Sequence, residues 1–164
     1  MPSFDLISKI DTMELQNCLN TTEKTIAGRF DFKGSEAKAD WKEKENIIEI
    51  RAEDEMKVKA VRDILLTNMG KRGIGVKGLE ESKIEPTGMK LQKMTIKLVS
   101  GIDKDKAKVI NRLLKESGSK VKSQYMDQKF RLESKSIDDL QEAFALLRKS
   151  DELNIDLQME NMKR

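Results

Sequence analysis

Ile48-Glu49-Ile50-Arg51, followed 82 residues later (48 to 130) by Phe130-Arg131-Leu132-Glu133, is the stretch that decides the fold. Both segments alternate apolar and charged residues, which is typical of a β-strand with one buried face. The same offset pairs the candidate helix caps Asp54 and Ser136. Apolar residues of the two following helices also coincide: Val58 with Leu140, Val61 with Ala143, and Ile64 with Leu146. A repeat at a fixed offset predicts two copies of one structural unit.

On both sides of these two strands, the spacing of apolar residues predicts further helices and strands, and cap and turn residues mark where they begin and end. The predicted order of elements is the same in both halves. The predicted elements of the first half are a strand at 4–7, a helix from Asp11 to about Arg29, a hairpin over 37–51, a helix from Asp54 to Gly70, and a strand ending by Ile84. Those of the second half are a strand at 94–98, a helix from Asp103, a hairpin turning at 126–129, a helix from Ser136, and a strand over 153–159. Each half is therefore predicted to follow the order βαββαβ.

This order predicts an α+β protein made of two ferredoxin-like domains, each with a four-stranded antiparallel sheet and two helices on one face. The clearest break in the sequence is Pro86-Thr87-Gly88, which gives domains of residues 1–87 and 88–164. Because ferredoxin-like folds serve many unrelated functions, the fold by itself selects none of them.

The composition excludes several kinds of catalytic site. The sequence has no histidine and one cysteine. It therefore lacks the usual general base near neutral pH, the commonest metal ligand and the means to form an internal disulfide. We predict no catalytic residues, no metal site and no cofactor, while lysine or carboxylate chemistry stays open as a third class of function. Cys18 shares a predicted helix face with Leu15 and Leu19, which favours a buried thiol.

The sequence also indicates a cellular location. It has no run of about 18 apolar residues and no basic stretch followed by an apolar one at its start. We therefore expect a cytoplasmic protein without a membrane partner, present as a monomer or a weak oligomer.

Positive charge is unevenly distributed along the chain. Residues 1–88 hold 15 Lys and Arg against 17 Asp and Glu, and residues 89–164 hold 17 against 12. The outward positions of the predicted sheet in the second half carry four cations: Lys120, Lys122, Lys129 and Arg131. Because only 4% of the residues are aromatic, this basic sheet face suits phosphate contacts with a nucleic acid better than base stacking. A solvated sheet face is the alternative.

A second candidate site lies in the first half. The segment Arg29-Phe30-Asp31-Phe32-Lys33-Gly34 places two of the five phenylalanines between charged residues, and Lys71-Arg72-Gly73 ends the second helix. In a functional interpretation the rings stack on a base while the four cations hold phosphate. We expect the two clusters to converge at one sheet edge, on the premise that the two helices run parallel. The alternative is that the phenylalanines belong to the core and the cations are solvated.

Six short motifs spread over the whole chain are distinctive in combination. They are Met1-Pro2-Ser3-Phe4-Asp5, Arg29-Phe30-Asp31-Phe32-Lys33-Gly34, Lys71-Arg72-Gly73, Gly101-Ile102, Lys120-Val121 and Asp138-Asp139-Leu140-Gln141. At this spacing the sequence resembles the YajQ family of bacterial proteins. The resemblance implies a cytoplasmic nucleotide-binding protein of tandem ferredoxin-like domains. It also implies an association with purine nucleotides and RNA, cyclic di-GMP as a signal in some members, and no catalytic residues.

The resemblance further suggests that the first strands of the two repeats, about residues 3–8 and 92–99, are exchanged between the sheets. From the residues alone, each strand stays in its own repeat. Our leading hypothesis is a non-catalytic protein that binds a purine nucleotide, cyclic di-GMP or RNA through residues 29–34 and 71–73. The alternative is a protein-interaction adaptor that binds nucleotide only weakly.

Overall fold

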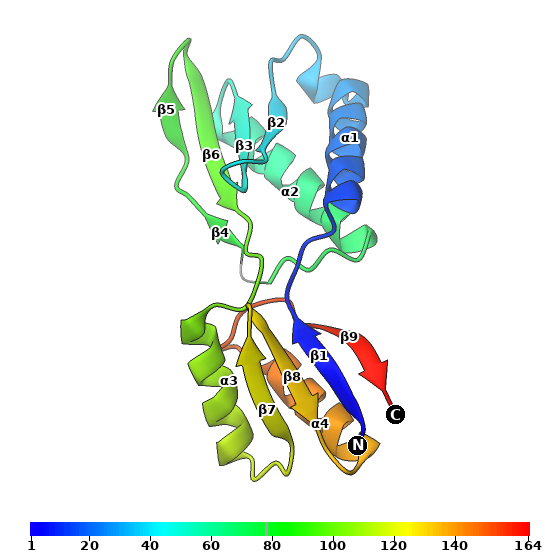
Figure 1. Cartoon of the computed structure of the whole chain (residues 1–164). Helices are drawn as coiled ribbons and strands as arrows, with labels where there is room; N and C mark the ends of the chain where they lie inside the picture. The colour runs from blue at the N-terminus through cyan, green and yellow to red at the C-terminus, as the bar shows by residue number, and fades with distance from the viewer. Residues whose placement is uncertain (78) are drawn as a thin grey trace. The chain divides into compact units, whose positions relative to one another are not determined.

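The computed structural model describes residues 1–77 and 79–164, so the predicted strand between Val76 and Ile84 lies partly outside the described residues. Its helices and strands follow the predicted order closely (Figure 1). In chain order they are β1 (Ser3–Ile7), α1 (Thr12–Gly28), the short 3-10 helix η1 (Phe30–Phe32), β2 (Lys38–Lys42), β3 (Ile47–Ala52), α2 (Glu55–Lys71), β4 (Glu80–Glu81), β5 (Glu85–Thr87), β6 (Leu91–Lys97), α3 (Lys104–Glu116), β7 (Lys122–Met126), β8 (Lys129–Glu133), α4 (Ile137–Lys149) and β9 (Gln158–Lys163).

The strands form two antiparallel sheets, and the exchange of first strands is confirmed. One sheet has the order β7-β8-β1-β9, so the first strand of the chain lies between two strands of the second repeat. The other has the order β2-β3-β6-β4, with β5 also paired to β6. Because β4 and β5 pair with successive parts of the same edge of β6, each sheet is four strands wide. The structure therefore has the predicted α+β, ferredoxin-like architecture.

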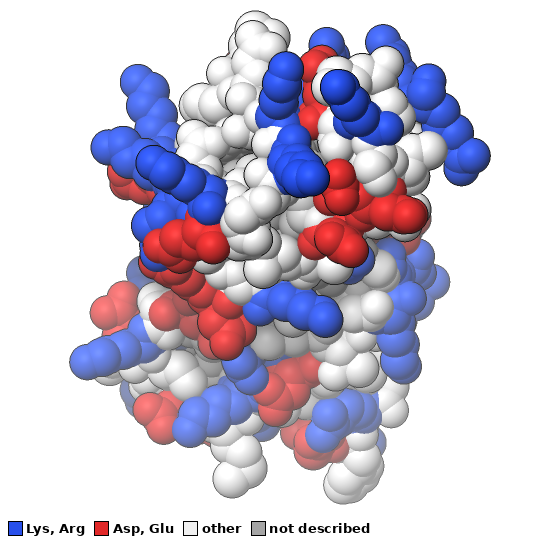
Figure 2. Space-filling view, turned by 90° about the horizontal axis from the view of Figure 1, so that it is seen from below, with Lys and Arg blue, Asp and Glu red and all other residues white. Residues whose placement is uncertain are grey.

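The exchange divides the chain into two compact units. We call residues 10–99 the N-unit, and residues 1–9 with 100–164 the C-unit. The N-unit holds 17 Lys and Arg against 16 Asp and Glu, and the C-unit holds 15 against 13. The charge difference between the two halves of the sequence is thus nearly lost in the folded units, because β6 carries its lysines into the N-unit. Figure 2 shows Lys and Arg side chains lying among Asp and Glu side chains on the face that it displays.

All four long helices begin at the residues that the sequence predicts as caps. Each cap is extended, and its side-chain oxygen accepts a hydrogen bond from a backbone N–H group in the first helical turn, a contact that contributes about 1 kcal/mol. The caps are Asp11 for α1, Asp54 for α2, Asp103 for α3 and Ser136 for α4. No described helix is long and apolar enough to cross a membrane.

Each unit buries the apolar side of its sheet beneath its two helices. In the C-unit, Phe4 of β1 packs edge-on against Phe144 of α4, with ring centroids 5.9 Å apart. In the N-unit, Ile48, Ile50 and Ile96 are fully buried with residues of α1 and α2. Cys18 is buried in this core as predicted, and burial raises the pKa of its thiol.

The C-terminal strand differs from the prediction. Leu153, Ile155 and Leu157 alternate as expected and all three are buried, but they lie in the loop before β9. The ladder between β1 and β9 begins only where Ile7 pairs with Gln158. These leucine and isoleucine side chains therefore fill the core from a loop, which gives a strand-like pattern without strand hydrogen bonds.

Candidate functional site

The segment 29–34 forms a tight turn that separates its two phenylalanines. The Phe32 N–H donates to the Arg29 carbonyl at 3.1 Å, and the Lys33 N–H donates to the Phe30 carbonyl at 3.1 Å. The Phe32 side chain is 4% exposed and enters the core, whereas the Phe30 ring is 89% exposed. Phe32 therefore anchors the turn in the core, which is the alternative in which the phenylalanines are structural. The same turn presents Phe30 to solvent.

The Arg29 guanidinium is fixed at the base of this turn. Its Nε and Nη2 atoms donate to the two carboxylate oxygens of Asp31 at 3.0 and 2.8 Å, and its Cζ lies 5.3 Å from the centroid of the Phe32 ring. The hydrogen bond from Arg29 holds the pKa of Asp31 below its ordinary value. The Arg29 Nη1 atom forms no hydrogen bond with any described residue, so one edge of the guanidinium is available to a ligand.

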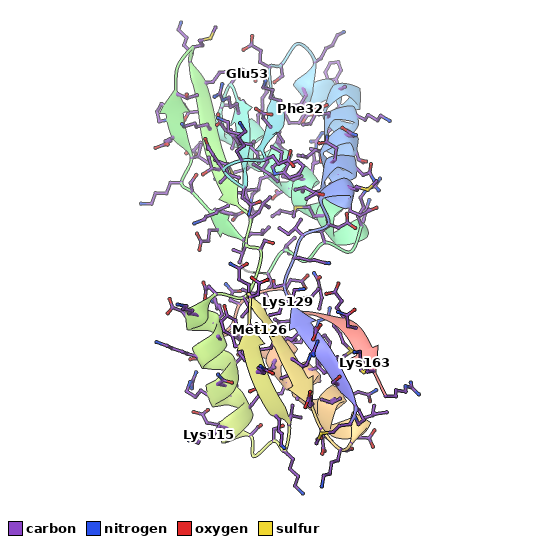
Figure 3. The ribbon with its side chains drawn as sticks, in the orientation of Figure 1. Phe32, Glu53, Lys115, Met126, Lys129 and Lys163 are labelled. Atoms are coloured by element: carbon purple, nitrogen blue, oxygen red, sulfur yellow. The ribbon has the colours of Figure 1, made fainter. Side chains whose placement is uncertain are left out.

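Glu53, which follows β3, fixes the chain on the other side of the turn. Its carboxylate accepts hydrogen bonds from the Ser35 hydroxyl at 2.6 Å, from the Glu36 N–H at 2.5 Å and from the Lys57 ammonium at 3.3 Å. Burial tends to raise the pKa of Glu53, but these hydrogen bonds prevail and lower it to about 2. Gly34, at φ +76°, supplies the left-handed residue that this return of the chain requires. Figure 3 labels Phe32 and Glu53 in the N-unit.

A groove between α1 and α2 adjoins the turn. It has a volume of about 420 Å³. One side of the groove is lined by Thr25 of α1 and by Arg29, which follows α1. The other side is lined by the α2 residues Ala60, Asp63, Ile64, Thr67, Asn68 and Lys71. The structure therefore brings Arg29 and Lys71 to one groove. Lys33 lies exposed at the end of η1, without an ion pair among the described residues.

Arg72 does not join this cluster, and the premise of parallel helices is wrong. Its Nη1 atom lies 3.4 Å from Oε2 of Glu14, near the start of α1, and its Nη2 donates to the Thr21 hydroxyl at 3.4 Å. The helices are therefore antiparallel, and the end of α2 lies opposite to the end of α1. Gly73, at φ +75°, follows Arg72 and ends the helix away from the 29–34 turn.

The predicted basic face of the C-unit sheet carries acidic side chains as well. Lys122, Lys129 and Arg131 lie on the side of the sheet away from its helices, and Figure 3 shows Lys129 near the turn that joins β7 and β8. Lys122 pairs across the strands with Glu133, and the Arg131 Nε lies 3.2 Å from Oδ1 of Asp5. The strand exchange places Asp5 here, which sequence reasoning missed.

Two further features complete this face. Asn161 of β9 donates to the Asp5 carboxylate at 2.9 Å, and this bond, together with Arg131, keeps the pKa of Asp5 below its ordinary value against the effect of burial. Lys120 precedes β7 and lines a separate cavity with α4 residues, including Asp139 and Glu142. Of the four predicted cations, three therefore share the sheet face and one does not.

Comparison with known proteins identifies the family. The sequence model of the family described as "Nucleotide-binding protein YajQ-like" matches residues 2–163. Proteins named "Nucleotide-binding protein" from Cytophaga hutchinsonii and Citrifermentans bemidjiense are 43% and 45% identical to this chain, with alignments covering 99% of the chain and 100% and 99% of the relatives. A similarly named protein from Bdellovibrio bacteriovorus is 42% identical, with 99% of both chains covered. The chain therefore belongs to the YajQ-like nucleotide-binding protein family.

Proposed function

We propose that this chain binds a purine nucleotide, free or within RNA, at the turn 29–34 and the adjoining groove, and releases it chemically unchanged. The observation that carries the proposal is the Phe30 ring, which is 89% exposed on a turn anchored by the buried Phe32. An exposed aromatic ring on an anchored turn can stack on any of the bases. The names of the relatives, all nucleotide-binding proteins, support this ligand class.

Phosphate contacts come from the cations beside the ring. Arg29 keeps Nη1 free while Asp31 and the Phe32 ring fix the rest of its guanidinium, so little side-chain entropy is lost when it binds an anion. Lys33 extends from the same turn, and Lys71 lines the groove with Arg29. The groove volume of about 420 Å³ lies within the range of small-molecule sites. A base on Phe30 with its phosphates toward Arg29 and Lys33 fits this arrangement, while Lys71 lines the same groove at the end of α2.

Titration of the purified full chain with GTP, ATP, cyclic di-GMP and a short RNA at physiological salt tests the proposal. We expect saturable binding of at least one of these ligands, with the bound nucleotide recovered intact. Turnover that is lost on substitution in the site would show an enzyme instead. If none of the four binds, the protein-interaction adaptor becomes the better hypothesis, with Phe30 as an apolar anchor for a protein partner.

A further inference from the structure

The two equivalent edge strands of the repeats differ in how well they are covered. In the N-unit this strand is β2, and in the C-unit it is β7. Ala39 of β2 lies opposite Ile50 and is 4% exposed. Its counterpart in β7 is Ser123, which lies opposite Leu132 but is exposed to solvent. All residues of β7 except Tyr125 are exposed. The C-unit sheet therefore has an open edge.

The helix that precedes the open edge is the shorter of the two. α1 has 17 residues, and Ile26 near its end is buried in the same core as Ala39. α3 has 13 residues and ends before the corresponding position. When the helices are aligned from their caps, Asp11 and Asp103, the counterpart of Ile26 is Gly118. Glycine has no side chain that could cover the start of β7.

The remaining sheet edges carry features that discourage the addition of a further strand. β4 has two residues, and β5 has three residues and contains Pro86. β9 is irregular, because its register shifts along β1 and Asn161 has φ +55°. In contrast, β7 has neither a proline nor a register shift. Among the described residues, its backbone hydrogen-bonds only to β8.

The turn between β7 and β8 determines which backbone groups of β7 point outward. Both residues of this turn, 127–128, have positive φ (+52° and +63°), as in a type I′ hairpin turn. Such a turn joins its flanking residues, here Met126 and Lys129, by a hydrogen bond. Hydrogen-bonded and non-hydrogen-bonded pairs then alternate along the strands. The N–H and C=O groups of Ser123 and Tyr125 therefore point away from β8.

One side of α3 lies along this edge and carries lysines. The Ser123 hydroxyl donates to Oδ1 of Asn111 at 2.9 Å, which places the Asn111 side of the helix beside β7. Three exposed lysines lie on the same side of α3, three, four or seven residues from Asn111. They are Lys104, Lys108 and Lys115, the last of which is labelled in Figure 3. Within the described part of the chain these lysines form no ion pair, whereas the neighbouring Arg112 pairs with Glu116 and Glu152.

We propose that β7 accepts an extended segment of a partner protein as an added strand, and that this segment alternates acidic and apolar residues. The outward N–H and C=O groups of Ser123 and Tyr125 form the main-chain hydrogen bonds to it. Alternate side chains of the added strand face the α3 lysines on one side of the sheet. On the other side they face Met126, which is 64% exposed. Acidic residues match the lysines, and apolar residues cover Met126.

Two other occupants fit this edge less well. Antiparallel pairing of β7 with β7 of a second copy would bring the lysines of two α3 helices towards each other, and like charges repel. A nucleic acid would pair with the lysines but would leave the outward N–H and C=O groups of β7 without a strand partner. The inference goes beyond the proposed function and does not rest on it, since every contact that it uses lies in the C-unit.

The test measures binding of labelled peptides of about eight residues, an ordinary strand length, to the full chain by fluorescence anisotropy. One peptide alternates Glu and Val, one alternates Lys and Val, and one is the Glu–Val peptide with a central proline. Ser123→Pro removes an outward N–H group, and Lys104→Glu/Lys108→Glu reverses two charges of α3. The matched control, Lys24→Glu/Lys59→Glu, reverses two exposed charges on α1 and α2.

We expect only the Glu–Val peptide to bind, and to bind the wild type and the control variant alike. Ser123→Pro should abolish binding, and Lys104→Glu/Lys108→Glu should weaken it about tenfold at low salt. The charge reversal should leave the Tm near that of the wild type, because Glu is favourable in the first turn of a helix. It therefore tests the inference even if Ser123→Pro does not fold. Hydrogen exchange of the Ser123 and Tyr125 amides should slow about tenfold when the peptide saturates the wild type.

Three results of the peptide experiment would overturn the inference: no binding of the Glu–Val peptide by the wild type, equal binding of the Lys–Val peptide, or unchanged exchange of the Ser123 and Tyr125 amides. Two further results would assign the edge to another occupant. A wild-type dimer in analytical ultracentrifugation that Ser123→Pro converts to a monomer would identify a second copy. Displacement of the peptide by a short oligo-dT would assign the lysines to a nucleic acid.

Discussion

The Arg72 guanidinium lies against the Glu14 carboxylate, with Nη1 3.4 Å from Oε2. This pair joins the last turn of α2 to the first turn of α1, and it shows that the two helices are antiparallel. The cluster at 71–73 is thereby split, because Lys71 lines the groove with Arg29 while Arg72 turns to the start of α1. Cations that are close in sequence therefore have separable roles.

The two arginines should respond differently to substitution. Arg29→Ala removes a direct phosphate contact and should weaken nucleotide binding by about 1.5–3 kcal/mol. Arg72→Ala should change the nucleotide affinity by no more than about twofold, because the Arg72 charge acts on the ligand only at long range, where salt screens it. Isothermal titration calorimetry on both folded variants checks this difference. Equal losses would show that Arg72 contacts the ligand directly.

Glu53 should make the stability of the N-unit depend on acid pH. Its pKa is lowered from 4.5 to about 2 in the folded state, so its contribution is complete above about pH 4.5 and is lost as the pH falls towards 2. Because its side chain is 35% exposed, we expect screening by water to limit this contribution to about 1–2 kcal/mol. Denaturant unfolding of the wild type and Glu53→Gln should show that difference at pH 7.

The same comparison at pH 3 should give a smaller difference between the wild type and Glu53→Gln. Glu23→Gln, on the exposed side of α1, is the matched control and should behave like the wild type at both pH values. A difference that stays constant from pH 7 to pH 2.5 would contradict the role given to the Glu53 carboxylate.

The strand exchange predicts which fragments fold. Residues 10–99 contain every strand of the N-unit sheet, whereas residues 1–87 lack β6, which lies between β3 and the β4–β5 edge. The fragment 10–99 should therefore unfold cooperatively with dispersed amide resonances, and the fragment 1–87 should not. Cooperative unfolding of 1–87 together with collapse of 10–99 would mean that each repeat keeps its own first strand in solution.

Gly101 and Gly118 allow a test of close packing in the C-unit. Both have positive φ, at +86° and +70°, but a Cβ atom on Gly101 would also collide with the Gln128 side chain, whereas one on Gly118 would meet nothing. Gly118→Ala should cost about 1–2 kcal/mol, and Gly101→Ala should cost more. In thermal unfolding, adding Gln128→Ala to Gly101→Ala should restore the smaller loss. Equal losses for the two single variants would show that Gln128 simply moves aside.

Local signals in the sequence predicted most of the fold. The caps Asp11, Asp54, Asp103 and Ser136 start helices because a side chain and an amide only a few residues away satisfy each other. The hairpins are equally local, and the internal repeat is visible directly in the sequence at its offset of 82 residues. The exchange of strands is not, because β1 and β6 both alternate apolar residues and fit either sheet. It was expected only from the resemblance to the family.

The geometry of the site could not be predicted from the sequence without the tertiary structure, except for the relative direction of the two helices. Whether Phe30 or Phe32 enters the core depends on the 3-10 turn, which the sequence did not indicate. The position of Asp5 beside Arg131 depends on the exchange. The helix directions, in contrast, could have been deduced: β2 and β3 form an antiparallel hairpin, α1 runs into β2 and α2 follows β3, so the two helices must be antiparallel to each other.

The most direct test of nucleotide binding at the turn 29–34 is the affinity of Phe30→Ala for the tightest-binding nucleotide among GTP, ATP and cyclic di-GMP. Met89→Ala is the matched control, because Met89 is 88% exposed at the tip of the β5–β6 hairpin. Loss of base stacking should weaken binding by about 1–3 kcal/mol, roughly 5- to 150-fold in Kd, while Met89→Ala binds like the wild type. An unchanged Kd for folded Phe30→Ala would contradict a site at this turn.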